Sequence, residues 1–106
     1  MPKATLKLPV LNQTTLAGYI ASEAERLTTS TGIGATFIVA VPRGRHRETE
    51  LIYVPCVTWG ALAETLLNGS RRGLPVVISG SLGSRQLSKE LHVRVAALQF
   101  LNDAPT

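Results

Sequence analysis

Tyr53 and Trp59 lie on segment 51–59, which reads Leu-Ile-Tyr-Val-Pro-Cys-Val-Thr-Trp and predicts a β-strand. The two residues are separated by an even number of positions. Because side chains alternate along a strand, both rings should leave it by one face. Two rings on one face either belong to a core or form a platform on which bases of a single-stranded nucleic acid stack. The chemistry available to this segment is therefore base stacking.

A basic loop precedes that strand. Segment 43–50 contains Arg43, Arg45 and Arg47, and it connects two expected strands. Such a loop is either a solvated tip or a contact for phosphates, and its continuity with the Tyr53–Trp59 strand favours the second interpretation. His46 sits between two arginines, whose charges oppose a metal cation. The single Cys56 allows neither an internal disulfide nor a multi-thiolate zinc site. We expect no metal and no cofactor.

Composition limits the classes of protein to consider. The chain has 106 residues, 44% of them hydrophobic and 17% charged, which is typical of one globular domain. The formal charge of +4 and the pI near 9.8 favour an anionic partner. The sequence has no apolar signal region, no long apolar span and no nucleophile motif. We therefore expect a binding protein rather than an enzyme, in a cytoplasmic compartment and not at a membrane.

The rest of the chain predicts a small β-protein. Gly18, within the first expected strand, indicates a bend or a close backbone approach. Residues 23–31 either extend that strand or begin a turn. The Asn68-Gly69 pair predicts a left-handed end to a short helix. The expected elements are strands at 12–22, 35–41 and 51–59, a helix at 61–68, a strand at 74–82, a hairpin at 83–88 and a strand at 89–101.

One short helix between the third and fourth of five strands is the arrangement of the OB-fold. We therefore predict an all-β, five-stranded OB-fold barrel with one short helix between strands 3 and 4. This fold binds oligonucleotides across its strand 2–3 face, and the two rings lie on strand 3. Residues 1–11 would be an arm or a peripheral strand, residues 12–102 the binding domain, and residues 103–106 a short tail.

The sequence resembles the bacterial single-stranded DNA-binding protein family over residues 12–101. The resemblance rests on short motifs that are weak singly but occur together in order. These motifs are Leu16-Ala-Gly-Tyr-Ile20, Glu25-Arg26, Ala35-Thr-Phe-Ile-Val-Ala40, Val57-Thr-Trp-Gly60, Ala63-Glu64, Val76-Val-Ile-Ser-Gly-Ser-Leu82 and Leu98-Gln-Phe-Leu101.

The resemblance implies a function and a set of site residues. In that family, single strands wrap over homo-oligomeric OB-folds in replication, recombination and repair. By position, stacking falls on Tyr53 and Trp59. Phosphate contacts fall on Arg72, ahead of the fourth strand, and on Arg85, after it. We therefore expect sequence-tolerant binding of single-stranded DNA by a homo-oligomer, either a tetramer or a dimer.

Three departures keep other interpretations open. Arg45 or a neighbour, and Leu87, occupy places where the family often carries rings. No Gly/Pro-rich linker and acidic tip follow Leu101, so the sequence is either a trimmed chain or a tail-less relative such as the primosomal protein PriB, with replication or primosome proteins as partners. A third possibility is an OB-fold that binds RNA or only protein. A dimer rather than a tetramer would favour the PriB-like alternative.

Overall fold

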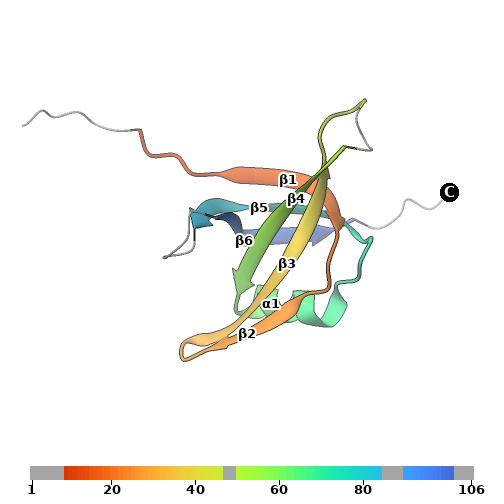
Figure 1. Cartoon of the computed structure of the whole chain (residues 1–106). Coiled ribbons are helices and arrows are strands. Elements are labelled where there is room, and N and C mark those ends of the chain that lie inside the picture. Colours follow the sequence, from red (N-terminus) through yellow and green to blue (C-terminus); the bar gives the residue numbers. More distant parts are fainter. Residues whose placement is uncertain (1–8, 47–49, 85–89, 102–106) are drawn as a thin grey trace, which may run out of the picture.

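A computed structural model describes residues 9–46, 50–84 and 90–101. Arg47, Arg85 and most of the expected arm and tail lie outside these residues. The described chain forms six strands and one helix (Figure 1). The elements are β1 (Thr14–Ile20), β2 (Glu25–Thr29), β3 (Gly32–Pro42), β4 (Leu51–Trp59), α1 (Ala61–Gly69), β5 (Pro75–Ser84) and β6 (Leu91–Phe100).

Five of the strands close into a barrel. The sheet order is β1-β5-β6-β4-β3-β2, and an additional antiparallel pairing joins β1 to β3. All neighbours in the barrel are antiparallel except β4 and β6, which run parallel at Cys56–Val93 and Val57–Arg94. With α1 between β4 and β5, the third and fourth barrel strands, the predicted OB-fold barrel is confirmed.

Two glycines allow the barrel to close. A methyl group on Gly18 would collide with the backbone carbonyl of Ala40, and one on Gly80 would collide with that of Arg94. Gly18 lies where β1 approaches β3, and Gly80 lies at the register shift between β5 and β6. The close approach predicted at Gly18 is therefore present, because a side chain there would hold the closing strands apart.

The barrel interior is filled by alternate residues of each strand. Thr58 is the one buried polar side chain among the described residues, and its hydroxyl donates a 2.9 Å hydrogen bond to the carbonyl of Val95. This bond extends the short parallel contact between β4 and β6. The core cluster consists of Ile20, Phe37, Val39, Cys56, Leu66, Val76, Ile78, Val93 and Val95.

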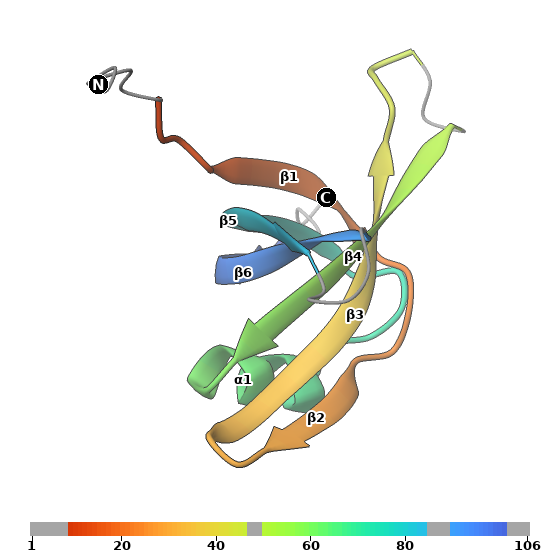
Figure 2. The same cartoon turned by 60° about the vertical axis from the view of Figure 1, so that its left-hand side comes forward.

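The helix α1 packs against β3 and β4 at one end of the barrel (Figures 1 and 2). Leu66 on its inner face is fully buried, which stabilises the fold by roughly 1.5–3 kcal/mol. The predicted left-handed end at Gly69 is wrong. The helix ends in extended Ser70, whose amide donates to the carbonyl of Leu66, and the left-handed residue is Gly73 (φ 88°). The turn needed to enter β5 therefore lies four residues later.

Residues 23–31, for which two interpretations were open, form a strand and a turn. β2 pairs only with β3, from Glu25–Thr36 to Thr29–Gly32, and this hairpin extends beyond the barrel (Figure 2). Strand β5 runs to Ser84, into the segment predicted to be a hairpin; residues 85–89 of that segment lie outside the described residues. Within the part of the chain that the structure describes, no helix could cross a membrane.

Candidate nucleic-acid interface

Strand β4 presents its two rings on the outside of the barrel. Tyr53 is 62% exposed and Trp59 is 41% exposed, whereas Cys56 and Thr58, of opposite parity, are buried. Neither ring therefore belongs to the core. Pro55 and Val57 share the outward parity, so the surface between the rings is apolar.

The indole of Trp59 lies over a glycine. Gly34 on β3 is in register with Trp59, and a Cβ at Gly34 would come within 2.6 Å of Cε3 and Cζ3 of the indole. On the other side of Gly34, β2 places Leu27 in the same row. The glycine thus lets the six-membered ring settle on the sheet beside a partly exposed leucine.

Tyr53 has a similar setting. Its register partner on β3 is Ala40, which is fully buried, and Ala40 is also paired with Tyr19 of β1. Two tyrosines thus flank one small residue on the outer face. Tyr19 was not among the predicted site residues. Its position on the face of β1 opposite Leu16 and Ile20 was the signal that could have identified it.

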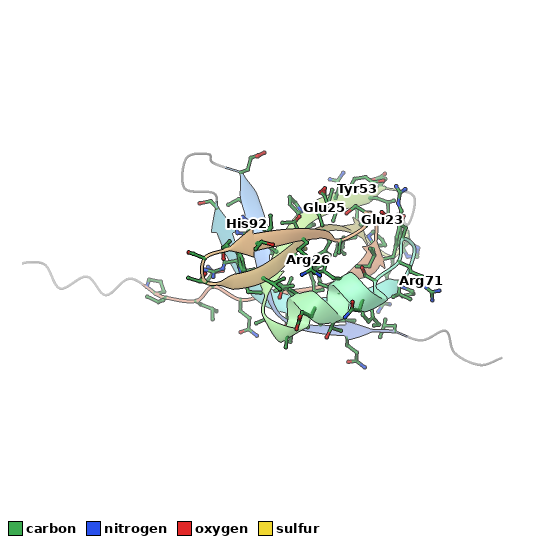
Figure 3. The ribbon with its side chains drawn as sticks, turned by 90° about the horizontal axis from the view of Figure 1, so that it is seen from below. Glu23, Glu25, Arg26, Tyr53, Arg71 and His92 are labelled. Atoms are coloured by element: carbon green, nitrogen blue, oxygen red, sulfur yellow. The ribbon has the colours of Figure 1, made fainter. Side chains whose placement is uncertain are left out.

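A groove of about 640 Å³ crosses the outer face between β2 and the β5–β6 end. Trp59 and Ile38 contribute apolar surface to it. Glu25 enters from β2, and His92 and Arg94 enter from β6. In Figure 3, Glu25, His92 and Tyr53 come from three strands and lie on the side of the view opposite α1. The groove therefore combines one indole with charged side chains that sequence reasoning did not assign to the site.

The predicted arginines that the structure describes, Arg43, Arg45 and Arg72, do not line the groove. Arg43 is exposed and forms a 3.5 Å ion pair with Glu50, and Arg45 is exposed on the same loop beyond the Tyr53 end of β4. Arg72 donates a 3.3 Å hydrogen bond from Nε to the carbonyl of Ala21 and lines a separate hollow of about 310 Å³. Among the described residues, Arg94 on β6 lines the groove and is in register with Val57, which lies between the two rings on β4.

The described residues contain no group of three His, Cys, Asp or Glu that could hold a metal ion. Burial raises the pKa of the Cys56 thiol from 9.0 to about 12, with a hydrogen bond from the Val39 backbone acting in the opposite direction. The thiol therefore stays protonated near neutral pH, and Cys56 is buried as a member of the core cluster. A protonated, buried thiol is neither a nucleophile nor a metal ligand.

A closed five-stranded barrel with one helix between its third and fourth strands defines the class of OB-fold proteins. The sequence model of the "Single-strand binding protein family" matches residues 11–103. The chain belongs to this family.

Relatives and solved structures agree with this membership. The chain is 31% identical over 98 residues to single-stranded DNA-binding protein 2 of Streptococcus pyogenes serotype M18, covering 89% of this chain and 60% of that protein. It is 32% identical over 90 residues to the single-stranded DNA-binding protein of Lactiplantibacillus plantarum, covering 81% and 45%. The chain thus spans at most about 60% of the length of these relatives.

Two solved structures share the fold. The second single-stranded DNA-binding protein of Mycobacterium smegmatis superposes with a TM-score of 0.71 at 27% identity, covering 84% of this chain and 87% of that one. The dimeric N-terminal domain of PriB from Thermoanaerobacter tencongensis superposes with a TM-score of 0.73 at 24% identity, covering 87% and 98%. The second likeness concerns the fold alone.

Proposed function

We propose that this chain binds single-stranded DNA with little dependence on sequence, by stacking bases on the outer face of β4. The observation that carries the proposal is the exposure of Tyr53 and Trp59 on one face of a barrel strand. Stacking contributes about 1–3 kcal/mol per base and tolerates any base, because every base has a π-face. Duplex DNA keeps its bases paired and stacked, so the same face should discriminate against it.

The spacing of the rings supports contact with a stretch of several nucleotides. Trp59 lies six positions after Tyr53 on β4, which places the two residues about 20 Å apart at roughly 3.3 Å per residue. The two rings therefore stack on different, non-adjacent bases. Between them, Pro55, Val57 and Ile38 offer apolar surface to the intervening bases.

Basic side chains would contact the phosphates. Arg94 supplies a positive charge within the groove, and Arg43 and Arg45 supply charge beyond Tyr53. Arg47, Arg72 and Arg85 remain proposed phosphate contacts. A formal charge of +4 per chain is modest, so tight binding would require several chains to act together, as a homo-oligomer. Each phosphate contact should add roughly 0.7 to the salt dependence of binding.

Because Trp59 is the chain's single Trp, its fluorescence tests the proposal directly. Titration with oligo-dT should quench the emission, while a duplex of equal length should not. The Trp59→Ala variant, followed by anisotropy of a labelled oligomer, should bind more weakly by about 1–3 kcal/mol. Tyr53→Phe keeps a ring and should bind like the unchanged chain. Equal quenching by duplex, or unchanged affinity of Trp59→Ala, would refute the proposal.

We infer a non-enzymatic role in replication, recombination or repair, in the cytoplasm with the nucleoid. Preference for oligo-rU over oligo-dT in the same titration would instead favour an RNA-binding protein. Absence of binding to either, together with a dimer in sedimentation, would favour the alternatives of a PriB-like primosome component or a protein-interaction module.

A further inference from the structure

The groove is electrically polarised across its width. Glu25 on β2 is in register with Thr36 on β3, Thr36 with Val57 on β4, and Val57 with Arg94 on β6. The row therefore has a carboxylate at one end and a guanidinium at the other. With neighbouring strands about 4.8 Å apart, the two backbone positions are separated by about 14 Å.

The side chains around Arg94, at one end of this row, also differ from those around Glu25, at the other end. On the β6 side, Arg94 and His92 both lie against Gly83: a Cβ there would meet Nε2 of His92 at 3.0 Å and Cδ of Arg94 at 3.3 Å. Glu90 also lines the groove on that side, and it is already engaged by another group. Among the described residues Glu25 takes part in no ion pair, so its carboxylate is available to a ligand.

We propose that a bound strand lies with its phosphates toward Arg94 and its base edges toward Glu25, and that Glu25 favours bases carrying an amino group, cytosine above all. This inference rests on the proposed function. A phosphate beside Glu25 would meet a like charge, whereas beside Arg94 it gains a charge-assisted hydrogen bond. A base stacked on Trp59 in this orientation directs its edge across Leu27 and Thr36 to the carboxylate.

The chemistry of the base edges gives the preference. A carboxylate accepts a hydrogen bond from the N4 amino group of cytosine. At the corresponding place thymine presents its O4 carbonyl, an acceptor that a carboxylate repels. The groove should therefore add a modest base preference to an otherwise sequence-tolerant platform.

The test compares labelled dC and dT oligomers of equal length on the unchanged chain, on Glu25→Gln and on Glu64→Gln. Glu64 is an exposed carboxylate on α1 outside the groove, so its variant controls for the loss of one negative charge. Glu25→Gln should lower the ratio of Kd for dT to Kd for dC by about five-fold, the difference between a charge-assisted and a neutral hydrogen bond. Glu64→Gln should leave that ratio unchanged.

The salt dependence of binding tests the proposed orientation, in which the phosphates lie toward Arg94. Arg94→Gln should reduce the salt dependence by roughly 0.7 for dC and dT alike, because a phosphate contact does not read the base. If Glu25→Gln changed the Kd for dC and the Kd for dT by the same factor, the inference would be overturned and the proposed function would stand. The same holds if Glu64→Gln changed the ratio of the two Kd values as much as Glu25→Gln does. Failure of the unchanged chain to bind either oligomer would refute both.

Discussion

Gly34→Ala tests whether the indole must lie on the sheet in order to stack. A Cβ at Gly34 would stand 2.6 Å from two atoms of the Trp59 ring and 3.1 Å from the Thr58 carbonyl oxygen. Carbon atoms pack at about 3.5–4.0 Å, so the ring must retreat by roughly 1 Å or leave its rotamer. An off-rotamer side chain costs about 0.5–1.5 kcal/mol. Replacing a glycine in a strand returns about 0.4–1 kcal/mol through the unfolded chain.

These two terms nearly offset each other, so the free energy of unfolding should change by less than about 1 kcal/mol. Binding should suffer more, because the displaced ring no longer presents its face to a base. We expect a loss of about 1–2 kcal/mol, or five- to thirty-fold in Kd, within the contribution of one stacked base. Gly69→Ala is the control, since apart from its chain neighbours and the backbone of its own helix no atom lies within 4 Å of its would-be Cβ.

The assay is fluorescence anisotropy with a labelled dT oligomer, with stability measured in parallel by urea unfolding. The decisive comparison uses a Trp59→Ala background, where no indole is left to displace. Gly34→Ala should then have no effect on Kd, a coupling that a double-mutant cycle measures. An equal loss of affinity in both backgrounds would refute the reasoning, as would unchanged affinity of the single variant.

Three further predictions concern the strand and its loop. Thr58→Val removes the hydroxyl that donates to the carbonyl of Val95 and should lower the free energy of unfolding by about 0.5–1.5 kcal/mol in urea melts, whereas Thr58→Ser should retain most of this contribution. Burial raises the pKa of the Cys56 thiol from 9.0 to about 12, so the folded state favours the protonated thiol more than the unfolded state does. The stability that comes from this difference is fully present below pH 9 and is lost as the pH rises from 9 to 12. Cys56→Ala should therefore have a smaller fall in unfolding free energy over that pH range, measured by urea melts. Arg43→Gln should lower the salt slope of binding by roughly 0.7 while changing stability by less than about 1 kcal/mol, because the exposed pair with Glu50 contributes little; an unchanged slope would place Arg43 off the DNA path.

Local pattern was sufficient to predict the outward rings. The parity of Tyr53 and Trp59 is a property of β4 alone, and the apolar residues between them did not obscure it. The order of strands and helix likewise predicted the barrel, since it depends only on which segments are extended. The face of the sheet to which each side chain points follows from alternation along its own strand, so it can be predicted from the sequence of that strand alone.

The groove could not be predicted in this way. Glu25 and Arg94 share a row only because three strand registers, one of them the parallel β4–β6 contact, place them there. Register across distant strands depends on closure of the whole barrel. Arg72 shows the same limit: its place in the sequence suggested a phosphate contact, which stays a prediction, but gave no sign that its Nε donates to the carbonyl of Ala21 or that it lines a separate hollow. The helix end was missed because Asn-Gly favours a left-handed residue without requiring one.

Under the proposed function, the alternation of β4 separates the residues that stabilise the fold from the residues that bind DNA. Inward Cys56 and Thr58 are buried, and Thr58 joins β4 to β6, while outward Tyr53 and Trp59 are exposed and do not belong to the core cluster. Substitutions at the outward positions should therefore change Kd at nearly constant unfolding free energy, and those at the inward positions should do the reverse. A ring variant that melts early would show that its effect on affinity comes from the fold rather than from stacking.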